Sequence, residues 1–333
     1  MKILSIKLRA IGDTVIWTSA LQDLRRAFPN AEIHTLTYAA NEPVLREHPA
    51  VTVQHYLQTK SRWELVRTLW SFRAQKFDWL LGFHATTSLC KWAWLAGAAK
   101  RSIHHHSWTQ TPSGSVPIPR AGQLEDAIAR DHRVLQAIGV TGKAAPTHIY
   151  LTTTEVQTAE DKIALGIIAA KGNPKLPRYL FLPGASHDLR RYPKDQWLPL
   201  AEKIKDRYQP VVIVDEPLSR ELGLGEECRK RGIPLFDRST LREFMALISR
   251  GERALANDSG PAHIAVALDI KTSFVFGPGC VGDWHPYDKT QHPLYRIEVP
   301  CRAEGPRDKP EFQFCTVDKC SHHRCMRELK VDL

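Results

Sequence analysis

The chain begins MKILSIKLRAIGDTVIWTSAL (residues 1–21), in which a strand pattern runs directly into a helix pattern. Residues 3–7 alternate as a β-strand does, and residues 14–27 have helical character. Gly12 and Asp13 occupy the joint between them. Asp13 has two interpretations: a helix N-cap, worth about 1 kcal/mol of stability, or a general base at the mouth of a site. This segment alone favours the cap, and it predicts a strand followed at once by a helix.

The same alternation of strand and helix continues along the chain, which at 333 residues is long enough for two domains. Further strands are predicted at 32–37, 52–56, 79–83, 101–104, 179–182, 210–214, 253–256 and 272–276. Further helices are predicted at 42–47, 63–74, 88–96, 123–138, 194–208, 219–231, 241–250 and 261–268. Such alternation is typical of parallel sheets covered by helices on both faces. The sequence therefore predicts an α/β protein with two Rossmann-like domains, in which the carboxyl ends of the strands can meet at a cleft.

The alternation of predicted strands and helices also gives the expected domain boundaries. We expect an N-terminal domain over residues 1–139 and an interdomain stretch over 140–177, where the alternation breaks. A C-terminal domain is expected over 178–300. An irregular, cysteine-rich tail follows over 301–333, ending in a short helix.

The composition is that of a globular protein with a positive bias. Lys and Arg number 46 against 36 Asp and Glu, which gives a formal net charge of +10. This bias favours anionic partners such as phosphates, lipid surfaces or nucleic acid. No helix-turn-helix or aromatic–basic RNA motif occurs, so nucleic acid is not an expected partner. No 18-residue apolar run or export signal is visible, which favours the cytoplasm.

The loops that follow predicted strands are the candidate binding loops. The first, RAIGDTV (residues 9–15), lacks the glycines of G-x-G-x-x-G, and no G-x-x-x-x-G-K-[ST] occurs, so NAD chemistry and P-loop phosphoryl transfer are not expected. The second, FLPGASHDLRRYPKDQW (residues 181–197), combines small residues with Arg190 and Arg191, whose guanidinium groups suit a phosphate. A solvated surface turn is the alternative. The position directly after an apolar strand favours the phosphate site.

The third loop opens the segment NDSGPAHIAVAL (residues 257–268). Gly260 stands at a predicted helix start, where free N–H groups can bind a diphosphate and a glycine lets it come close. Asp258 or Ser259 could equally cap that helix. His263, in the first turn, is by itself more typical of a packed or capping histidine than of a catalyst.

The fourth loop, FGPGCVGDWHPYDK (residues 276–289), has aromatic residues that could stack on a base or sugar, or merely close a hydrophobic lid.

Taken in order, GD near the start, PGAS…RRYP, NDSGPxH and FGP…WHPY resemble glycosyltransferase family 9, the bacterial heptosyltransferases. The segments TSALQDLRRAFPNAEIHTLT, FDWLLGFHATTSLCKWAWLAGAAKR and HRVLQAIGV extend the resemblance over nearly the whole chain. It implies a GT-B fold, in which the first domain binds mainly the acceptor and the second binds the nucleotide-sugar.

The resemblance also implies a role for each matching residue. Asp13 falls on the family's catalytic carboxylate, the base for the acceptor hydroxyl. Arg190 falls on a cationic position, usually Lys, that faces the donor phosphates. Tyr192 replaces the family's usual Trp, a change that affects packing more than chemistry. Donor-binding residues are expected at Ser186, Arg191, Ser239, Asp258, Ser259, Gly260 and His263, with Asp258 contacting the sugar.

The implied reaction is an inverting transfer of heptose from ADP-heptose to a lipopolysaccharide inner-core acceptor, with no cofactor needed for catalysis. Domain closure would exclude water from the donor. Lys60, Arg62 and Arg101 are the expected contacts to an anionic glycolipid, with peripheral attraction to the anionic inner membrane; ordinary solvated side chains are the alternative. Other readings of the chain are a family member with a different nucleotide-sugar, one with a protein or other glycan as acceptor, or a non-catalytic nucleotide-binding protein.

The cysteines gather near the end of the chain, where five of the seven lie from Cys280 onward. Cys301, Cys315, Cys320 and Cys325 have the spacing C-x13-C-x4-C-x4-C. A structural zinc or iron site would use them, but the spacing lacks the tight C-x2-C pair. Buried free thiols and a disulfide are the alternatives, and a disulfide is disfavoured in a cytosolic chain. The sequence leaves these three interpretations open and gives the cluster no catalytic role.

Overall fold

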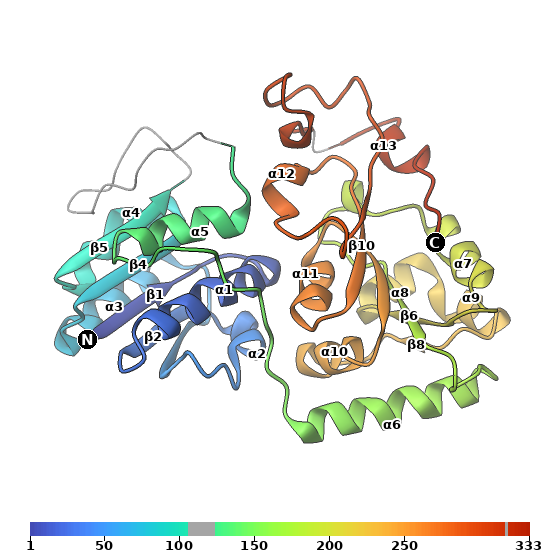
Figure 1. Ribbon diagram of the computed structural model, residues 1–333, viewed down its shortest axis with the longest axis horizontal. Coiled ribbons are helices and arrows are strands. Elements are labelled where there is room, and N and C mark those ends of the chain that lie inside the picture. The colour runs from blue at the N-terminus through green and yellow to red at the C-terminus, as the bar shows by residue number, and fades with distance from the viewer. Residues whose placement is uncertain (106–123, 317–318) are drawn as a thin grey trace. The chain divides into compact units, whose positions relative to one another are not determined.

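A computed structural model describes residues 1–105, 124–316 and 319–333 of the chain. They divide into two compact units, Met1–Tyr150 (unit 1) and Leu151–Leu333 (unit 2), each with its own parallel sheet (Figure 1). The division falls inside the stretch 140–177 where the alternation breaks. The same stretch contains α6 (Thr153–Ala169), a helix of unit 2 that the sequence pattern did not predict.

Unit 1 has five parallel strands in the order β3-β2-β1-β4-β5. The strands are β1 (Lys2–Ile6), β2 (Glu32–Tyr38), β3 (Val53–Leu57), β4 (Trp79–Ala85) and β5 (Lys100–His105). The helices are α1 (Ile11–Ala27), α2 (Glu42–Leu45), α3 (Arg62–Ser71), α4 (Thr87–Trp92) and α5 (Ala127–Gln136), with short 3-10 turns η1 (Ala39–Asn41), η2 (Phe72–Gln75) and η3 (Ala93–Ala96). The chain winds from β1 to β3 on one side and restarts with β4 on the other, so the topological switch point lies between β1 and β4.

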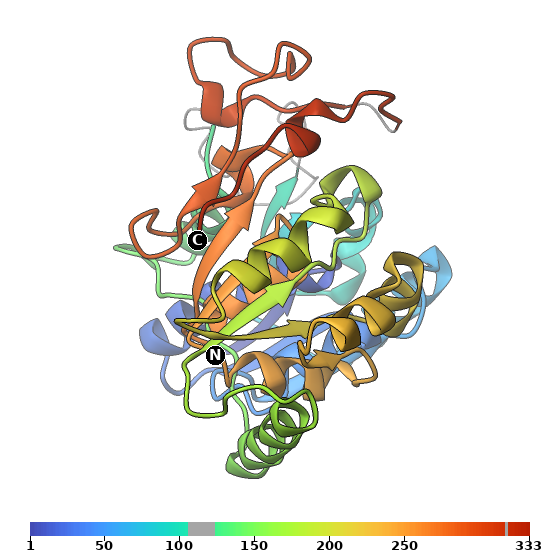
Figure 2. The ribbon, with the colours of Figure 1, turned by 90° about the vertical axis from the view of Figure 1, so that its right-hand side faces the viewer.

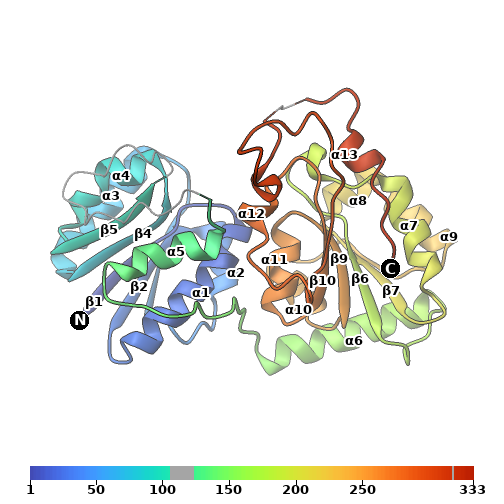
Figure 3. The ribbon, with the colours of Figure 1, turned by 45° about the horizontal axis from the view of Figure 1, so that its top comes forward.

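Alternate residues of the strands in unit 1 enter two separate cores, one on each face of the sheet. Ile3 and Leu81 pack among the apolar side chains of α1, α2 and α5. Leu4 and Leu80 pack among those of α3, α4 and the turns after them. Figure 3 shows α1 and α5 on one side of the strands and α3 and α4 on the other. Helices on both faces explain why the inner strands β1, β2 and β4 are almost wholly buried.

Unit 2 has six parallel strands in the order β11-β10-β9-β6-β7-β8, and its switch point lies between β9 and β6. The strands are β6 (Arg178–Leu182), β7 (Gln209–Ile213), β8 (Leu235–Phe236), β9 (Arg253–Asn257), β10 (Lys271–Val275) and β11 (Leu294–Tyr295). Besides α6, the helices are α7 (Lys194–Lys203), α8 (Glu216–Leu222), α9 (Leu224–Lys230), α10 (Leu241–Ile248), α11 (Gly260–Ala267), α12 (Val281–Trp284) and α13 (Arg324–Arg327), with 3-10 turns η4 (Asp188–Arg190) and η5 (Pro310–Phe312).

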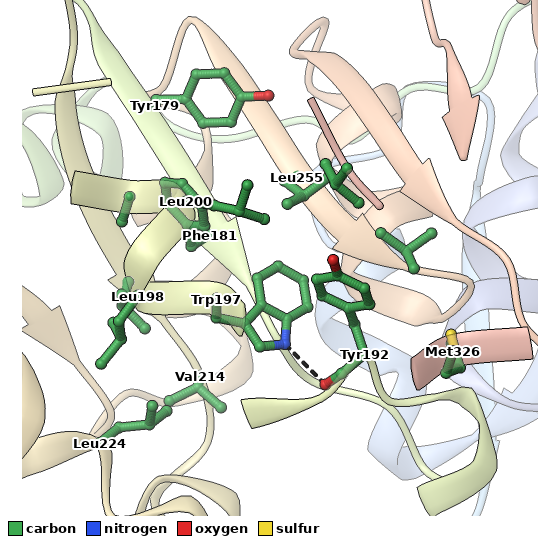
Figure 4. Packing of buried hydrophobic residues seen from close by; sticks show 14 of the residues in the cluster. Tyr179, Phe181, Tyr192, Trp197, Leu198, Leu200, Val214, Leu224, Leu255 and Met326 are labelled. Atoms are coloured by element: carbon green, nitrogen blue, oxygen red, sulfur yellow. Dashed lines mark hydrogen bonds between the residues drawn. The ribbon is translucent and has the colours of Figure 1, made fainter. Parts of the chain in front are cut away.

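The end of the tail belongs to the core of unit 2. Met326 and Leu329 are buried in the cluster around Trp197, whose indole N–H donates to the carbonyl of Tyr192 at 3.0 Å (Figure 4). The Tyr192 hydroxyl in turn donates to the carbonyl of Leu329 at 3.1 Å. The last residues run beside β11 (Figure 2), where the Tyr295 hydroxyl donates to the carbonyl of Asp332. The tail therefore contributes side chains to the packed interior.

Several predicted helices have other bounds in the structure than the pattern indicated. The helix expected at 219–231 is two helices, because Gly223 between them has a left-handed backbone with φ 66°. The helix expected at 194–208 ends at Lys203. Gln123, the expected start of another helix, lies outside the described residues, and α5 begins after an Asp126 N-cap. In the described part of the chain, no helix is both long and apolar enough to cross a membrane.

Candidate active site

The first candidate site is the switch point of unit 1, where Asp13 lies in the first turn of α1. The residue before that helix, Ala10, is its N-cap and makes no side-chain cap bond, so Asp13 is not the N-cap that the segment alone favoured. Its Oδ1 lies 3.0 Å from Nδ1 of His84. Because β1 and β4 are neighbours, their carboxyl ends bring together two residues that are 71 positions apart.

His84 is a functional candidate that the sequence did not single out. It lies near the end of β4, where the register with β5 shifts between Gly82 and Ala85, and its backbone is left-handed with φ 48°. Its carbonyl accepts a hydrogen bond from Nε of Arg9 at 2.8 Å. A strained backbone beside a carboxylate is typical of functional sites. The position after a predicted strand was the available signal, but only the sheet order places it beside Asp13.

The surroundings of Asp13 keep its carboxylate ionised. Burial raises the pKa of Asp13, but the hydrogen bond with His84 and the charges of Lys7 and Arg9 outweigh burial, so that pKa lies below its usual range. Burial lowers the pKa of His84, although Asp13 opposes this, so the imidazole is neutral near pH 7 and donates its Nδ1–H. Lys7 is itself buried and paired with Asp131 at 2.6 Å. The result is a charged, oriented carboxylate at neutral pH.

The predicted acceptor-binding residues occupy two edges of unit 1. Lys60 and Arg62 are exposed where the chain leaves β3, at the carboxyl edge of the sheet that also carries Asp13. Arg101 pairs with Leu80 near the start of β5, at the amino edge. The structure therefore places Lys60 and Arg62 near one another and does not bring Arg101 to the same edge.

The second candidate site is the switch point of unit 2, where two loops are fastened together. The side chain of Asn257, at the end of β9, accepts from the N–H of Tyr192 at 2.9 Å and donates to the carbonyl of Pro183 at 2.8 Å. The hydroxyl of Ser259 donates to the carbonyl of Gly184 at 2.6 Å. Ser259 is thus the N-cap residue of α11 by position, but its hydroxyl binds the neighbouring loop instead of the helix. These bonds hold the loops after β6 and β9 as one structure.

Asp258 lies between these loops in surroundings unlike those of Asp13. Burial raises the pKa of Asp258 to about 6, and the charge of Arg190 opposes that rise. The Nη1 atom of Arg190 is 3.7 Å from Oδ2 of Asp258, and no described residue donates a hydrogen bond to that oxygen. A Cβ on Gly279 would lie only 2.3 Å from the same oxygen, so a larger residue there would displace the Asp258 carboxyl group. A buried carboxyl oxygen that receives no hydrogen bond from the protein is suited to accept a hydrogen bond from a ligand.

Arg190 also lines a pocket of about 310 Å³. The pocket is completed by residues after β10, including Gly279 and Trp284, and by Phe314 from the tail. It therefore offers a guanidinium group for an anion and an aromatic surface for a sugar or a base. Both kinds of contact were expected from separate loops, and the fold of unit 2 brings them to one pocket.

The other residues predicted to bind the donor have different surroundings. Arg191 is committed to the protein, because its guanidinium contacts Glu221 at 2.9 Å and Asp188 at 2.8 Å. Ser186 is exposed on the loop after β6. His263 is buried, with Nδ1 2.7 Å from the Tyr287 hydroxyl.

The remaining predicted positions lie at the starts of helices. Gly260 is the first residue of α11. The Ser239 hydroxyl, just before the capping box of α10, is buried and has no hydrogen-bond partner among the described residues. Both positions follow strands at the carboxyl edge of the sheet in unit 2, the edge that also carries Asp258.

The cysteines of the tail are free thiols in this structure. Cys301, Cys315, Cys320 and Cys325 all line one small cavity of about 20 Å³. Burial raises the pKa of the Cys325 thiol to about 11, which favours the protonated form. Within the described ranges, no group of three or more His, Cys, Asp or Glu side chains is placed to hold a metal ion. The structure thus gives no support to the metal site that the spacing allowed.

Comparison with known proteins gives a consistent result. Residues 63–311 match the model of glycosyltransferase family 9 (heptosyltransferase). Lipopolysaccharide heptosyltransferase 3 of Escherichia coli (strain K12) is 23% identical over 335 residues, which cover 91% of each chain. The crystal structure of a family 9 glycosyltransferase from Veillonella parvula DSM 2008 has a TM-score of 0.74 at 18% identity, over 88% of this chain and 84% of that one. The structure of E. coli ADP-heptose lps heptosyltransferase II has a TM-score of 0.71 at 19% identity, over 90% and 91%. This likeness confirms the predicted GT-B fold class.

Proposed function

The chain belongs to glycosyltransferase family 9, the heptosyltransferases, and we propose that it transfers heptose from ADP-heptose to the inner core of lipopolysaccharide, with inversion at the anomeric carbon. The names of its relatives support this choice of donor and acceptor. The observation that carries the proposal is the pairing of Arg190 with the buried carboxyl group of Asp258 beside a pocket of about 310 Å³. A cation next to an unsatisfied hydrogen-bond acceptor suits a phosphate that is joined to a polyhydroxylated sugar.

In this proposal unit 2 holds the donor. Arg190 contacts the diphosphate. The backbone N–H of Gly260 at the start of α11 adds a hydrogen bond to the diphosphate, and the helix dipole favours its negative charge. Asp258 accepts a hydrogen bond from a heptose hydroxyl through its Oδ2 atom. Arg190 and the N–H of Gly260 offset the negative charge that grows on the leaving diphosphate, which is the main electrostatic demand of the reaction.

Unit 1 supplies the base. The acceptor hydroxyl oxygen attacks the anomeric carbon of heptose while Asp13 takes the hydroxyl proton. The bond from the anomeric carbon to the diphosphate oxygen breaks, and ADP leaves with the electron pair. His84 is a positioning residue that holds the Asp13 carboxylate through its Nδ1–H. The acceptor hydroxyl loses its proton to Asp13 and the heptose loses ADP, so one bond forms for each bond that breaks. We assign no cofactor to the step.

The acceptor that fits this proposal is an anionic glycolipid, and the place of reaction is the cytoplasmic face of the inner membrane. Lys60 and Arg62, at the same sheet edge as Asp13, support the assignment, since their charges are exposed and suit acidic sugars and phosphates. Arg101 lies at the other edge and is not assigned to the same contact.

The test is turnover of ADP-heptose by the purified full chain with a panel of truncated lipopolysaccharide acceptors. We expect ADP release together with a mass increase of one heptose on acceptors of one length only. ADP-heptose should also raise the melting temperature, because a ligand that binds the folded state stabilises it. Turnover of another nucleotide-sugar would replace the donor in this proposal. Absence of both binding and turnover with every nucleotide-sugar would overturn the enzymatic role.

A further inference from the structure

Helix α3 exposes two large aromatic side chains on one face. Trp63 is 82% exposed and Trp70 is 59% exposed, whereas Leu65 and Leu69 on the inner face are buried. Trp63, Val66, Arg67 and Trp70 have the spacing of a single helical stripe and line a shallow groove of about 760 Å³. Trp94, in the turn η3 that packs against α3, is 49% exposed. An exposed group of this kind marks an interaction surface.

The segment of the chain that carries these tryptophans has an excess of positive charge. Residues 58–101 contain eight Lys or Arg and two acidic residues: Lys60, Arg62, Arg67, Arg73, Lys76, Lys91, Lys100 and Arg101 against Glu64 and Asp78. The Glu64 carboxylate accepts hydrogen bonds from the backbone N–H groups of Gln58 and Thr59 at 2.7 and 2.9 Å. The Arg73 guanidinium lies over the Trp70 ring at 5.1 Å. The groove is lined by two indole rings, one cation, Arg67, and the already hydrogen-bonded Glu64, and a further cation, Arg73, lies beside it over Trp70.

We propose that this face of α3 docks on an anionic lipid surface, with Trp63 and Trp70 placed at the level of the headgroups. Indole rings concentrate at that level in membrane proteins, and Lys and Arg nearby bind the lipid phosphates. The inference deepens the proposed function, in which the acceptor is a glycolipid, and it names the surface that brings the chain to that acceptor.

The test is co-sedimentation of the full chain with vesicles, in the absence of donor and acceptor. We expect binding to vesicles of phosphatidylcholine mixed with phosphatidylglycerol, little binding to phosphatidylcholine alone, and weakening of binding by salt. The double variant Trp63→Ala/Trp70→Ala should lose about tenfold in partitioning. Arg67→Glu should lose roughly fivefold or more for the cation removed. A matched control is Leu165→Ala/Ile168→Ala, which removes two exposed apolar side chains from α6 and should bind as the wild type does.

Three results would overturn the proposal: equal binding to neutral and anionic vesicles, equal losses in both double variants, or a dimer that only Trp63→Ala/Trp70→Ala dissociates. An unchanged melting temperature checks that the tryptophan variant is folded. Turnover separates this inference from the proposed function. The tryptophan variant should keep wild-type turnover of a soluble, delipidated acceptor and lose it on the same acceptor embedded in vesicles. If no acceptor is turned over, the proposed function fails while the vesicle result still stands.

Discussion

Each sheet places an aspartate at its switch point, and the two carboxyl groups lie in opposite electrostatic surroundings. Asp13 accepts a hydrogen bond from His84 and lies near Lys7 and Arg9, and its pKa is lowered despite burial. Asp258 is buried with the Arg190 guanidinium 3.7 Å away, and burial raises the pKa of Asp258 to about 6. The same residue type, at the switch points of two similar sheets, is therefore ionised in one unit and close to half-protonated near pH 6 in the other.

In the proposed function, this difference separates two chemical tasks. A carboxylate that removes a proton must be charged and oriented before the substrate arrives. A carboxyl group that binds a sugar hydroxyl works better when an oxygen is left without an internal partner, at the expense of stability. Four measurements test this contrast between the two aspartates.

Asp13→Asn should lower turnover about 100- to 10,000-fold, since the base for the acceptor hydroxyl is lost. The fold and the binding of ADP-heptose should be retained, because Asn has the same size. Steady-state kinetics and a thermal shift with donor would measure both. Asp195→Asn, which changes an exposed aspartate in the first turn of α7, controls for the loss of a charge near a helix start. Near-normal turnover in Asp13→Asn would remove Asp13 from catalysis.

Arg190→Ala should weaken donor binding and lower kcat/KM by about 100-fold or more, because the leaving diphosphate loses its cation. Arg190→Lys should recover part of the loss, since an ammonium group keeps the charge without the paired geometry. Arg191→Ala is the matched control, because that guanidinium is already bound to Glu221 and Asp188. Equal losses in the two alanine variants would show that the loop as a whole, and not Arg190, is required.

Asp258→Asn should stabilise the protein at pH 8 by up to about 3 kcal/mol, since the folded pKa of about 6 lies above the ordinary value of 3.8. A carboxyl group whose pKa is raised by folding stabilises the folded state fully below about pH 4, where it is protonated in both states. This stabilisation is lost as the pH rises through 6. Little difference from the wild type is therefore expected at pH 4. Denaturant unfolding at pH 4, 6 and 8 would test this.

Asp13→Asn provides the contrast in the same unfolding experiment. A carboxylate whose pKa is lowered by folding stabilises the protein at pH values above its ordinary pKa, and this stabilisation is lost in acid. The Asp13→Asn variant should therefore be less stable than the wild type at pH 7. The same sign of effect in both asparagine variants would contradict the comparison of the two sites.

His84→Asn should lower kcat/KM by about tenfold, because a hydrogen bond to a charged group is lost. Asn tolerates the left-handed backbone at this position. Without the imidazole, the pKa of Asp13 should rise, so the acid limb of the pH–rate profile should move to higher pH. His55→Asn removes an imidazole from β3 and should leave the profile in place. An unmoved acid limb in His84→Asn would separate His84 from the charge state of Asp13.

Much of the fold followed from local pattern. The strand predicted at 32–37 is β2, Glu32–Tyr38, and the helix that follows β1 ends at the predicted residue, Ala27. The helix α6 was not predicted, although Thr152 and Glu155 form a capping box, because exposed Leu165 and Ile168 blur its polar face. The two-residue strands β8 and β11 are too short for any periodicity to show.

The strand pattern of the sequence shows which loops follow strands, and so it placed Asp13, Arg190 and Asp258 at the carboxyl edges, where ligands usually bind. It could not determine their charge states or their neighbours. Those depend on the order of strands within each sheet, which sets His84 beside Asp13 and Arg190 beside Asp258. A pKa responds to burial and to charges within a few ångströms, and only the tertiary structure brings residues 71 positions apart within that range.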